Sequence, residues 1–211
     1  MCCEYFENLY LADRHILTSG HCIDGCGEFD VVIGAPDSQY TVSSHKGFLH
    51  PEYDFILLAN DIGILELDEP IEFGSEFILI LLTFSGYDFK KKSITLGVAQ
   101  PICLATSNDY EDQITISSDY VKYSRVQIMN QNECEEYWGQ LNENVICSDV
   151  NCDCDVITSG GTLALAGPTY QQIGITSFGS SFGCDENIPK VHTEVYPYLN
   201  WISSVTGLEL K

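Results

Sequence analysis

HILTSGHC (residues 15–22) joins a short apolar run to a histidine that is followed at once by a cysteine. Taken alone, His21 has an ordinary explanation as a buried structural histidine. An imidazole is also the side chain best suited to take up a proton near neutral pH. Whether His21 has that role depends on which other reactive side chains the chain provides.

Two further stretches supply the side chains that a catalytic histidine needs. Asp61 stands in NDIGILEL (60–67) at the mouth of an apolar strand, and Ser159 stands in DVITSGGTLAL (155–165) before two glycines. Each has an alternative explanation, a strand cap for Asp61 and a turn residue for Ser159. A serine hydroxyl is a poor nucleophile unless a histidine accepts its proton and a carboxylate orients that histidine. Together, in the order His, Asp, Ser, the three residues favour a catalytic triad.

The composition indicates a globular chain with an acidic surface. The chain has 211 residues, 45% of them hydrophobic, which is enough for one large domain or two small ones. Its formal net charge of −22 argues against nucleic acid and anionic membranes as partners. The start, MCCEYFENLY, lacks the basic residues and apolar run of a signal peptide. We therefore expect that a signal has been removed or that the chain is incomplete at its N-terminus.

Ten cysteines are a high number for this length and indicate either disulfides or a metal site. Cys152 and Cys154, together with His21, Cys22 and Cys26, contain the residue types of a metal site, but no second histidine stands at ligand spacing. We therefore expect disulfides, no metal and a secreted, extracellular protein.

Short alternating apolar runs separated by turn residues dominate the chain and predict an all-β fold, a barrel or a sandwich. We expect strands at 29–35, 40–48, 61–67, 114–118, 124–129, 172–178 and 191–196.

Two helices are expected beside these strands. Residues 130–138 begin with Asn130 and carry Glu133 three positions on, the arrangement of a capping box. Residues 197–205 begin with a proline and place apolar side chains on one face.

The segment 74–100 does not fit the regular pattern. It holds an eight-residue apolar run, FILILLTF (77–84), followed by three lysines. Eight residues cannot cross a bilayer, which needs about 20. We expect an insertion with an extra buried strand; the alternative is an exposed, aggregation-prone stretch.

Five motifs in order give the chain a family resemblance. Five stretches of the chain resemble the sequence motifs of the chymotrypsin-like serine proteases. They are ILTSGHC, NDIGILELDEPIEF, QPICL (100–104), ITSGGTLAL and GITSFGSSFGCDENIPKVHTEVYPYLNWI (174–202). The similarity runs from about Leu11 to Trp201 and is interrupted by the insertion. The order His, Asp, Ser is that of the chymotrypsin type.

The resemblance implies two antiparallel β-barrels of the six-stranded type, with the active site between them, and a C-terminal helix. The implied division is 1–105 for the first barrel, which contains the insertion 74–100, 106–196 for the second barrel and 197–208 for the helix. One strand of the first barrel is missing, which leaves an unpaired edge. No IVGG-like start precedes the histidine motif.

The resemblance also assigns roles to the triad and to the loop before the serine. Ser159 attacks the peptide carbonyl, His21 is base and then acid, and Asp61 holds the imidazole tautomer. The oxyanion hole is assigned to the backbone of Ile157 and Ser159, with Val156 as the alternative to Ile157 in another register. Thr158 stands where the family has an aspartate that pairs with the new N-terminal ammonium group, so we expect low activity.

The substrate pocket that the resemblance implies is also altered. Its floor is Asp153, or Cys152 if one residue is inserted in the loop, and an aspartate there implies cleavage after Lys or Arg. Ser177, Phe178 and Gly179 form one wall. Lys190 replaces the wall glycine and either projects into the pocket, where it could neutralise Asp153, or bends outward to solvent.

The implied disulfides are Cys134–Cys147 and Cys154–Cys184, with Cys152 as a rival for Cys154. Cys22 is expected to pair with Cys3 or Cys2.

The implied function is that of a serine endopeptidase without metal or organic cofactor, acting as a monomer on protein or peptide substrates. The alternatives are a protease homologue that binds proteins without cutting them and a truncated chain without function.

Overall fold

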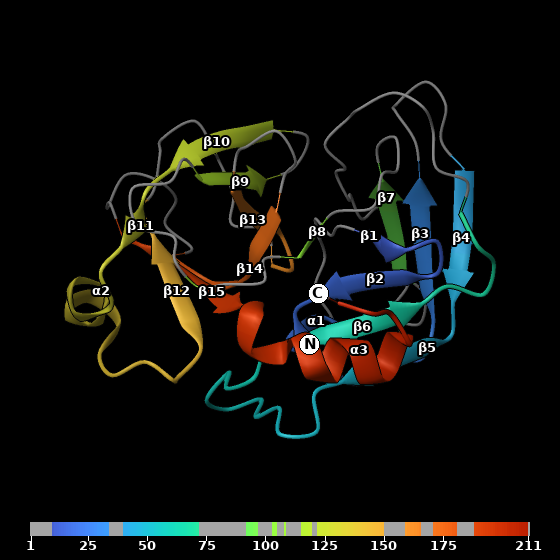
Figure 1. Ribbon diagram of the computed structural model, residues 1–211, viewed down its shortest axis with the longest axis horizontal. Helices are drawn as coiled ribbons and strands as arrows, with labels where there is room; N and C mark the ends of the chain where they lie inside the picture. Colours follow the sequence, from blue (N-terminus) through green and yellow to red (C-terminus); the bar gives the residue numbers. More distant parts are fainter. Residues whose placement is uncertain are drawn as a thin grey trace.

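A computed structural model gives the fold of the chain. It describes residues 10–33, 40–71, 92–96, 103–104, 108, 115–119, 122–149, 159–165, 171–180 and 188–210. Two groups of strands stand side by side, one built from the first part of the chain and one from the second (Figure 1). We call them the N-terminal half and the C-terminal half.

The N-terminal half consists of two small sheets. Its four-stranded sheet has the order β1-β2-β6-β5 and its three-stranded sheet the order β4-β3-β7. The strands are β1 Tyr10–Ala12, β2 His15–Thr18, β3 Phe29–Ile33, β4 Tyr40–Ser44, β5 Lys46–Leu49, β6 Gly63–Glu66 and β7 Lys92–Leu96.

Strand β7 comes from the segment that the sequence marked as an insertion. It pairs in parallel with β3, in a register that runs from Phe29 opposite Lys92 to Ile33 opposite Leu96. The other edge of β3 pairs with β4, so β3 has a neighbour on both sides. β3 is therefore an inner strand, and the two described sheets of this half end at β1 and β5 and at β4 and β7. The apolar run 77–84 lies outside the described residues.

The C-terminal half is one eight-stranded sheet with the order β10-β9-β13-β14-β15-β12-β11, in which β8 pairs in parallel with β14. The strands are β8 Cys103–Leu104, β9 Thr115–Asp119, β10 Lys122–Val126, β11 Ile128–Met129, β12 Val145–Ser148, β13 Thr162–Leu165, β14 Gln171–Phe178 and β15 Lys190–Glu194. Each of the seven predicted strand ranges overlaps one or two observed strands, whereas β1, β2, β7, β8, β12 and β13 lie outside these ranges.

Both expected helices are present. Helix α2 spans Gln131–Trp138, and the side chain of Asn130 accepts a hydrogen bond from the backbone N–H of Asn132 at its start. Helix α3 spans Leu199–Thr206 after a 3-10 turn at Tyr196–Tyr198. A further short helix, α1 at Gly20–Ile23, was not predicted.

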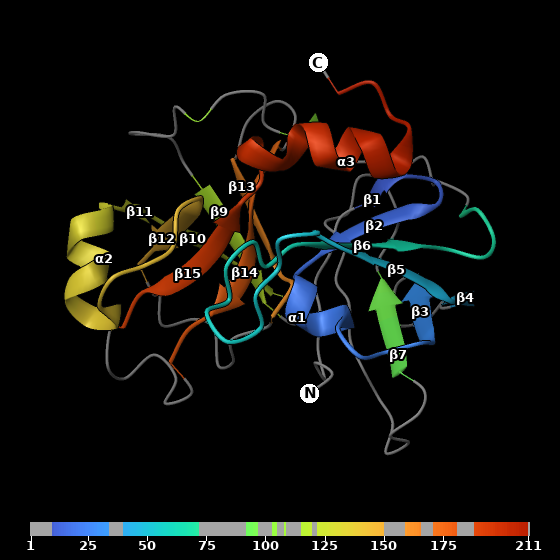
Figure 2. The same ribbon diagram turned by 90° about the horizontal axis from the view of Figure 1, so that it is seen from below.

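A shared hydrophobic core joins the two halves. Leu17 and Ile64 of the N-terminal half pack with Ile175 of the C-terminal half and with Ile202 of α3. Helix α3 lies over β2 and β6 and thereby fixes the N-terminal half to the end of the chain (Figure 2). Burial of these side chains is the main driving force that holds the halves together.

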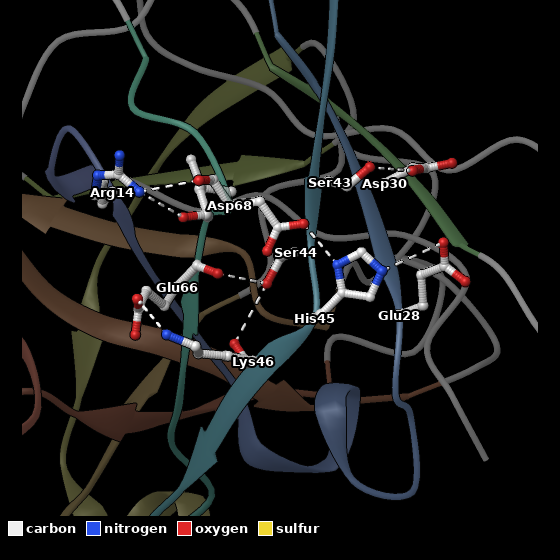
Figure 3. A network of polar contacts seen from close by, with 10 residues as sticks. Arg14, Glu28, Asp30, Ser43, Ser44, His45, Lys46, Glu66 and Asp68 are labelled. Atoms are coloured by element: carbon white, nitrogen blue, oxygen red, sulfur yellow. Dashed lines mark hydrogen bonds and ion pairs between the residues drawn. The ribbon is translucent and has the colours of Figure 1, made fainter.

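A network of polar contacts lies on the N-terminal half (Figure 3). His45 Nδ1 contacts Asp68 Oδ2 at 2.6 Å, and Lys46 Nζ contacts Glu66 Oε1 at 2.8 Å. The side chains of His45 and Lys46 are 55% and 61% exposed, so each pair adds little stability. Ser44 is buried and donates a hydrogen bond to the backbone oxygen of Glu66 at 2.8 Å, which ties the corner between β4 and β5 to β6.

Candidate active site

His21 and Asp61 are brought together by two neighbouring strands. His21 follows β2 in the short helix α1, and Asp61 precedes β6 by two residues. In the antiparallel register of β2 and β6, Thr18 lies opposite Gly63, so the two side chains leave the same end of the pair. His21 Nδ1 lies 2.7 Å from Asp61 Oδ2. The predicted hydrogen-bond contact between these residues is confirmed.

The carboxylate of Asp61 is fully buried and its oxygens are held by hydrogen bonds. Oδ1 accepts the backbone N–H of His21 at 2.8 Å, and Oδ2 contacts both the imidazole and the hydroxyl of Ser177, the latter at 2.5 Å. These bonds offset the cost of taking a charged group out of water. An ionised carboxylate only accepts hydrogen bonds, so Nδ1 of His21 carries the proton that it donates. In the neutral imidazole Nε2 is then the basic nitrogen.

Gly20 makes room for this arrangement. A Cβ atom added at Gly20 would lie 3.3 Å from Asp61 Oδ1 and 3.1 Å from the ring of Tyr53. Both distances are tighter than ordinary van der Waals contact, so a larger residue at this position would press on the carboxylate.

The C-terminal half contributes directly to the aspartate. Ser177, at the end of β14, donates to the Asp61 carboxylate, and Thr193 on β15 donates to the backbone oxygen of Asp61 at 2.9 Å. The sequence assigned Ser177 to the substrate pocket and gave Thr193 no role. The only sequence signal for these contacts is a serine and a threonine within predicted strands. Such residues are too common in strands for their role to be recognised.

Ser159 stands at the turn that leads into β13. The backbone N–H of Gly160 donates to the oxygen of Thr176 at 2.8 Å, and the N–H of Thr176 donates to the oxygen of Gly161 at 2.7 Å. Gly160 has φ +80°, a conformation that glycine adopts without strain. Thr176 immediately precedes Ser177, which binds Asp61. The backbone that carries Ser159 is therefore hydrogen-bonded to the strand end that holds the Asp61 carboxylate.

Lys190 is buried in the C-terminal half. Its side chain belongs to the first residue of β15 and only 5% of the residue is exposed. The alternative in which Lys190 bends outward to solvent is therefore wrong. In the ladder with β12, Lys190 lies opposite Ser148, another fully buried polar residue. Of the predicted pocket wall, Phe178 packs edge-on against Trp138 at a ring distance of 5.2 Å.

His192 lies two residues beyond Lys190, on the same face of β15, and is completely buried. Ser148 Oγ lies 2.9 Å from its Nε2 and Thr176 Oγ1 lies 3.1 Å from its Nδ1. Burial, and to a smaller degree the charge of Lys190, lower the pKa of His192 to about 3. His192 is thus a neutral hydrogen-bonding residue, and it supports the threonine whose backbone oxygen binds Gly160.

The disulfides predicted from the sequence are confirmed only in part. The predicted disulfide Cys134–Cys147 is confirmed and links α2 to β12. Cys22 carries a buried thiol that accepts a hydrogen bond from Ser19 Oγ at 2.9 Å, and Cys26 is disulfide-bonded. The expected disulfide from Cys22 to Cys3 or Cys2 is therefore wrong, and Cys26, four residues further on, is the bonded cysteine of this stretch.

Several predicted residues lie outside the described residues. They are Cys3, Asp153, Cys154, Ile157, Thr158 and Cys184, together with the alternatives Cys2, Cys152 and Val156.

The described ranges contain neither a metal-binding cluster nor a membrane-spanning helix. Among these residues no group of three or more histidine, cysteine, aspartate or glutamate side chains is arranged to hold a metal ion. In the same part of the chain no helix has the length and apolar character to cross a membrane.

Comparison with protein families gives a match over most of the chain. A family model described as Trypsin matches residues 9–202. Brachyurin from Leptuca pugilator is 31% identical, with 94% of this chain and 86% of that protein covered. Trypsin-1 from Astacus astacus is 27% identical, with 91% and 84% covered.

Solved structures show the same fold. Neuropsin, a serine protease expressed in the limbic system of mouse brain, superposes with a TM-score of 0.71 at 22% identity and covers 94% of this chain and 87% of its own. Kallikrein-related peptidase 10 gives a TM-score of 0.71 at 19% identity, with the same coverage. The chymotrypsin-like fold expected from the sequence is confirmed.

Proposed function

The chain belongs to the trypsin family of serine proteases, whose substrates are proteins or peptides, and from this premise we propose that it is a serine endopeptidase with low intrinsic turnover. Ser159, His21 and Asp61 are the proposed triad. The observation that carries the proposal is the contact of 2.7 Å between His21 Nδ1 and a fully buried Asp61 carboxylate. A charged group is rarely buried without a compensating role, and here it fixes the tautomer that a general base needs.

The proposed reaction uses these side chains in turn. Nε2 of His21 takes the proton of the Ser159 hydroxyl while Oγ forms a bond to the carbonyl carbon of the peptide. His21 then donates that proton to the leaving amine as the C–N bond breaks. Water, deprotonated by the same histidine, hydrolyses the acyl-enzyme. Asp61 stays ionised throughout and stabilises the imidazolium that forms in each step.

The low turnover is proposed from the loop before Ser159. Thr158 replaces the family aspartate that helps to shape the oxyanion hole, and β-branched Val156 or Ile157 stands where the family has glycine. A β-branched residue keeps its N–H but resists unusual backbone angles. Loss of one oxyanion donor typically lowers turnover by about 100- to 1000-fold.

A non-catalytic binding protein is the second candidate, and Lys190 favours it. A lysine that is only 5% exposed takes the place of the small pocket-wall residue of the family, and its charge opposes substrates with Lys or Arg beside the cleaved bond. A chain altered in this way could keep a protein-binding cleft without efficient hydrolysis.

Active-site labelling and peptide hydrolysis separate the two candidates. The disulfide-bonded chain is treated with a fluorescent phosphonate that reacts with activated serines, and Ser159→Ala is the matched control. We expect slow labelling and slow peptide hydrolysis, both abolished in Ser159→Ala. Equal rates of labelling and of hydrolysis in the wild type and in Ser159→Ala would favour the non-catalytic binding protein. Turnover in the ordinary enzyme range of about 1–1000 per second would contradict the impairment.

The remaining parts of the proposal follow from the family and the composition. The chain is proposed to be secreted, to act as a monomer and to have neither nucleic acid nor membrane as a partner. The barrel boundaries 1–105 and 106–196, the terminal helix 197–208 and the disulfide Cys154–Cys184 are kept as part of the proposal. Peptide mapping without reduction tests the disulfide.

A further inference from the structure

Asp61 occupies the centre of a tight backbone turn. The N–H of Ile62 donates to the backbone oxygen of Asn60 at 2.8 Å, which closes a three-residue turn around Asp61. Asn60 has φ +51°, in the left-handed region that asparagine tolerates better than most residues. The direction of the Asp61 carboxylate therefore depends on how firmly the backbone of this turn is held.

The side chain of Asn60 holds the first residue of the turn. Its amide nitrogen donates to the backbone oxygen of Glu52 at 2.8 Å, and its amide oxygen accepts a hydrogen bond from the hydroxyl of Tyr198 at 2.9 Å. The first contact stays within the segment between β5 and β6. The second spans 138 positions of the chain and reaches the 3-10 turn that leads into α3. Asn60 thus ties the turn around Asp61 to the start of the C-terminal helix.

Tyr198 belongs to the shared hydrophobic core and is only 4% exposed. The chain enters α3 at this residue, between the two halves (Figure 1). Burial raises the pKa of the Tyr198 hydroxyl above its ordinary value of 10, and a hydrogen bond with Asn144 opposes this rise. The hydroxyl is therefore protonated at neutral pH, as a donor to Asn60 must be.

His50 holds the other side of the turn. Its backbone N–H donates to the oxygen of Ile62 at 3.2 Å. Its ring meets the rings of Tyr198 and Trp201 at distances of 5.1 and 5.2 Å, both in the edge-on geometry that aromatic rings prefer. The residues on both sides of Asp61 are therefore connected to aromatic side chains at the start of α3.

We propose that Tyr198 is a positioning residue for Asp61, which acts through Asn60 and makes the contact between His21 and Asp61 depend on the docking of α3. His21 and Ser177 bind the Asp61 carboxylate directly, whereas Tyr198 acts on the backbone that carries it. The inference rests on the proposed function for the catalytic use of His21 and Asp61. The positioning itself is a property of the fold.

The Nδ1 proton of His21 reports how often this contact opens. The proton lies in the hydrogen bond to Asp61, so it exchanges with water only when that bond is broken. Without the Tyr198 hydroxyl the turn should open more often, and each opening moves the carboxylate away from His21. A hydrogen bond between neutral groups typically shifts such an equilibrium by about fivefold. The exchange rate of this single proton therefore measures the proposed positioning.

The test measures proton exchange by nuclear magnetic resonance and needs no hydrolysis. Ser159→Ala, labelled with ¹⁵N-histidine, is the background, and the absence of the signal in His21→Ala assigns the Nδ1 proton. Tyr198→Phe removes only the hydroxyl. Asn60→Gly removes the amide, and glycine adopts φ +51° without strain. The matched control is Tyr196→Phe, the same substitution in the same 3-10 turn at a tyrosine that is 37% exposed.

We expect the His21 proton to exchange about fivefold faster in Tyr198→Phe and at the background rate in Tyr196→Phe. Asn60→Gly also loses the contact to Glu52, so its rate should rise by at least as much. The double variant should match Asn60→Gly, because the bond between the two side chains can be lost only once.

Two results would overturn the proposal. A further increase of about fivefold in the double variant over Asn60→Gly would show that the tyrosine acts without Asn60. An unchanged His21 rate in Tyr198→Phe would show that the hydroxyl is merely structural; only amides that exchange by global unfolding, such as that of Ile64 in the core, would then exchange faster. The proposed function fails separately, if the protein with Ser159 hydrolyses peptides no faster than Ser159→Ala, and the exchange rates still decide the role of Tyr198.

Discussion

His192 is expected to make the fold sensitive to acid. Its side chain is completely buried between the hydroxyls of Ser148 and Thr176, and its pKa is lowered to about 3, first by burial and second by the charge of Lys190. A neutral imidazole donates one hydrogen bond and accepts one, which two hydroxyls can match. The protonated ring would bring a buried positive charge next to a buried lysine, so the folded state resists protonation.

The sign and size of the effect follow from the two pKa values of His192. In the unfolded chain the pKa is the ordinary 6.5, so below pH 6.5 the unfolded state binds a proton that the folded state does not. The free energy of unfolding then falls as the pH falls, over the window from about 6.5 to about 3. Between pH 7 and pH 5 the loss from this residue is about 2 kcal/mol, and between pH 7 and pH 3 it is about 4 kcal/mol.

Urea unfolding of the wild type and His192→Gln at pH 7 and pH 5 measures this contribution. Glutamine can donate and accept hydrogen bonds but does not titrate, so its free energy of unfolding should fall by about 2 kcal/mol less than that of the wild type. Other titrating groups are common to both proteins and cancel in the difference. His45→Gln, which makes the same substitution at a histidine that is 55% exposed, is the matched control. An identical decrease in the wild type and His192→Gln would refute the reasoning.

Three further outcomes are expected. Ser177→Ala removes a hydrogen bond to the buried Asp61 carboxylate and should lower the free energy of unfolding by about 1.5–3 kcal/mol in chemical denaturation; a loss below about 0.5 kcal/mol would show that the carboxylate does not depend on it. Cleavage of a small Arg-amide substrate should be weak and should increase in Lys190→Gly, whereas equal rates would show that Lys190 does not hinder the substrate. Asn130→Ala should lower stability by about 1 kcal/mol through loss of the α2 cap, compared with the neighbouring Gln131→Ala as control; equal stability of the two variants would contradict the capping role.

Most of the fold could be predicted from the sequence because local patterns repeat along it. Strands such as β3 and β14 have alternating or continuous apolar residues within their bounds, and the cap at Asn130 precedes α2 as expected. Strand β7 could not be predicted in this way. Its sequence, KSITL, gains its place from a long-range parallel pairing with β3, and no local pattern specifies such a partner.

Only part of the candidate site could be predicted from the sequence. His21 and Asp61 stand in motifs, and the register of β2 with β6 brings them together as expected. The hydroxyls that hold Asp61 come from residues 116 and 132 positions further along the chain, Ser177 and Thr193. Such contacts depend on how the two halves pack, and serine and threonine are too frequent in strands for their position to reveal them.

The same packing links the acid sensitivity of the fold to the site. Thr176 contacts His192 through its hydroxyl and holds Gly160 through its backbone, and the next residue, Ser177, binds Asp61. Protonation of His192 would therefore disturb the strand end that supports both the serine turn and the aspartate. The proposed activity is then lost at low pH in two ways, by protonation of His21, the proposed base, and by loosening of this strand end. Because His192→Gln removes only the second, its activity should persist to lower pH than that of the wild type if loosening comes first, and the two pH profiles should coincide if the proposed base is protonated first.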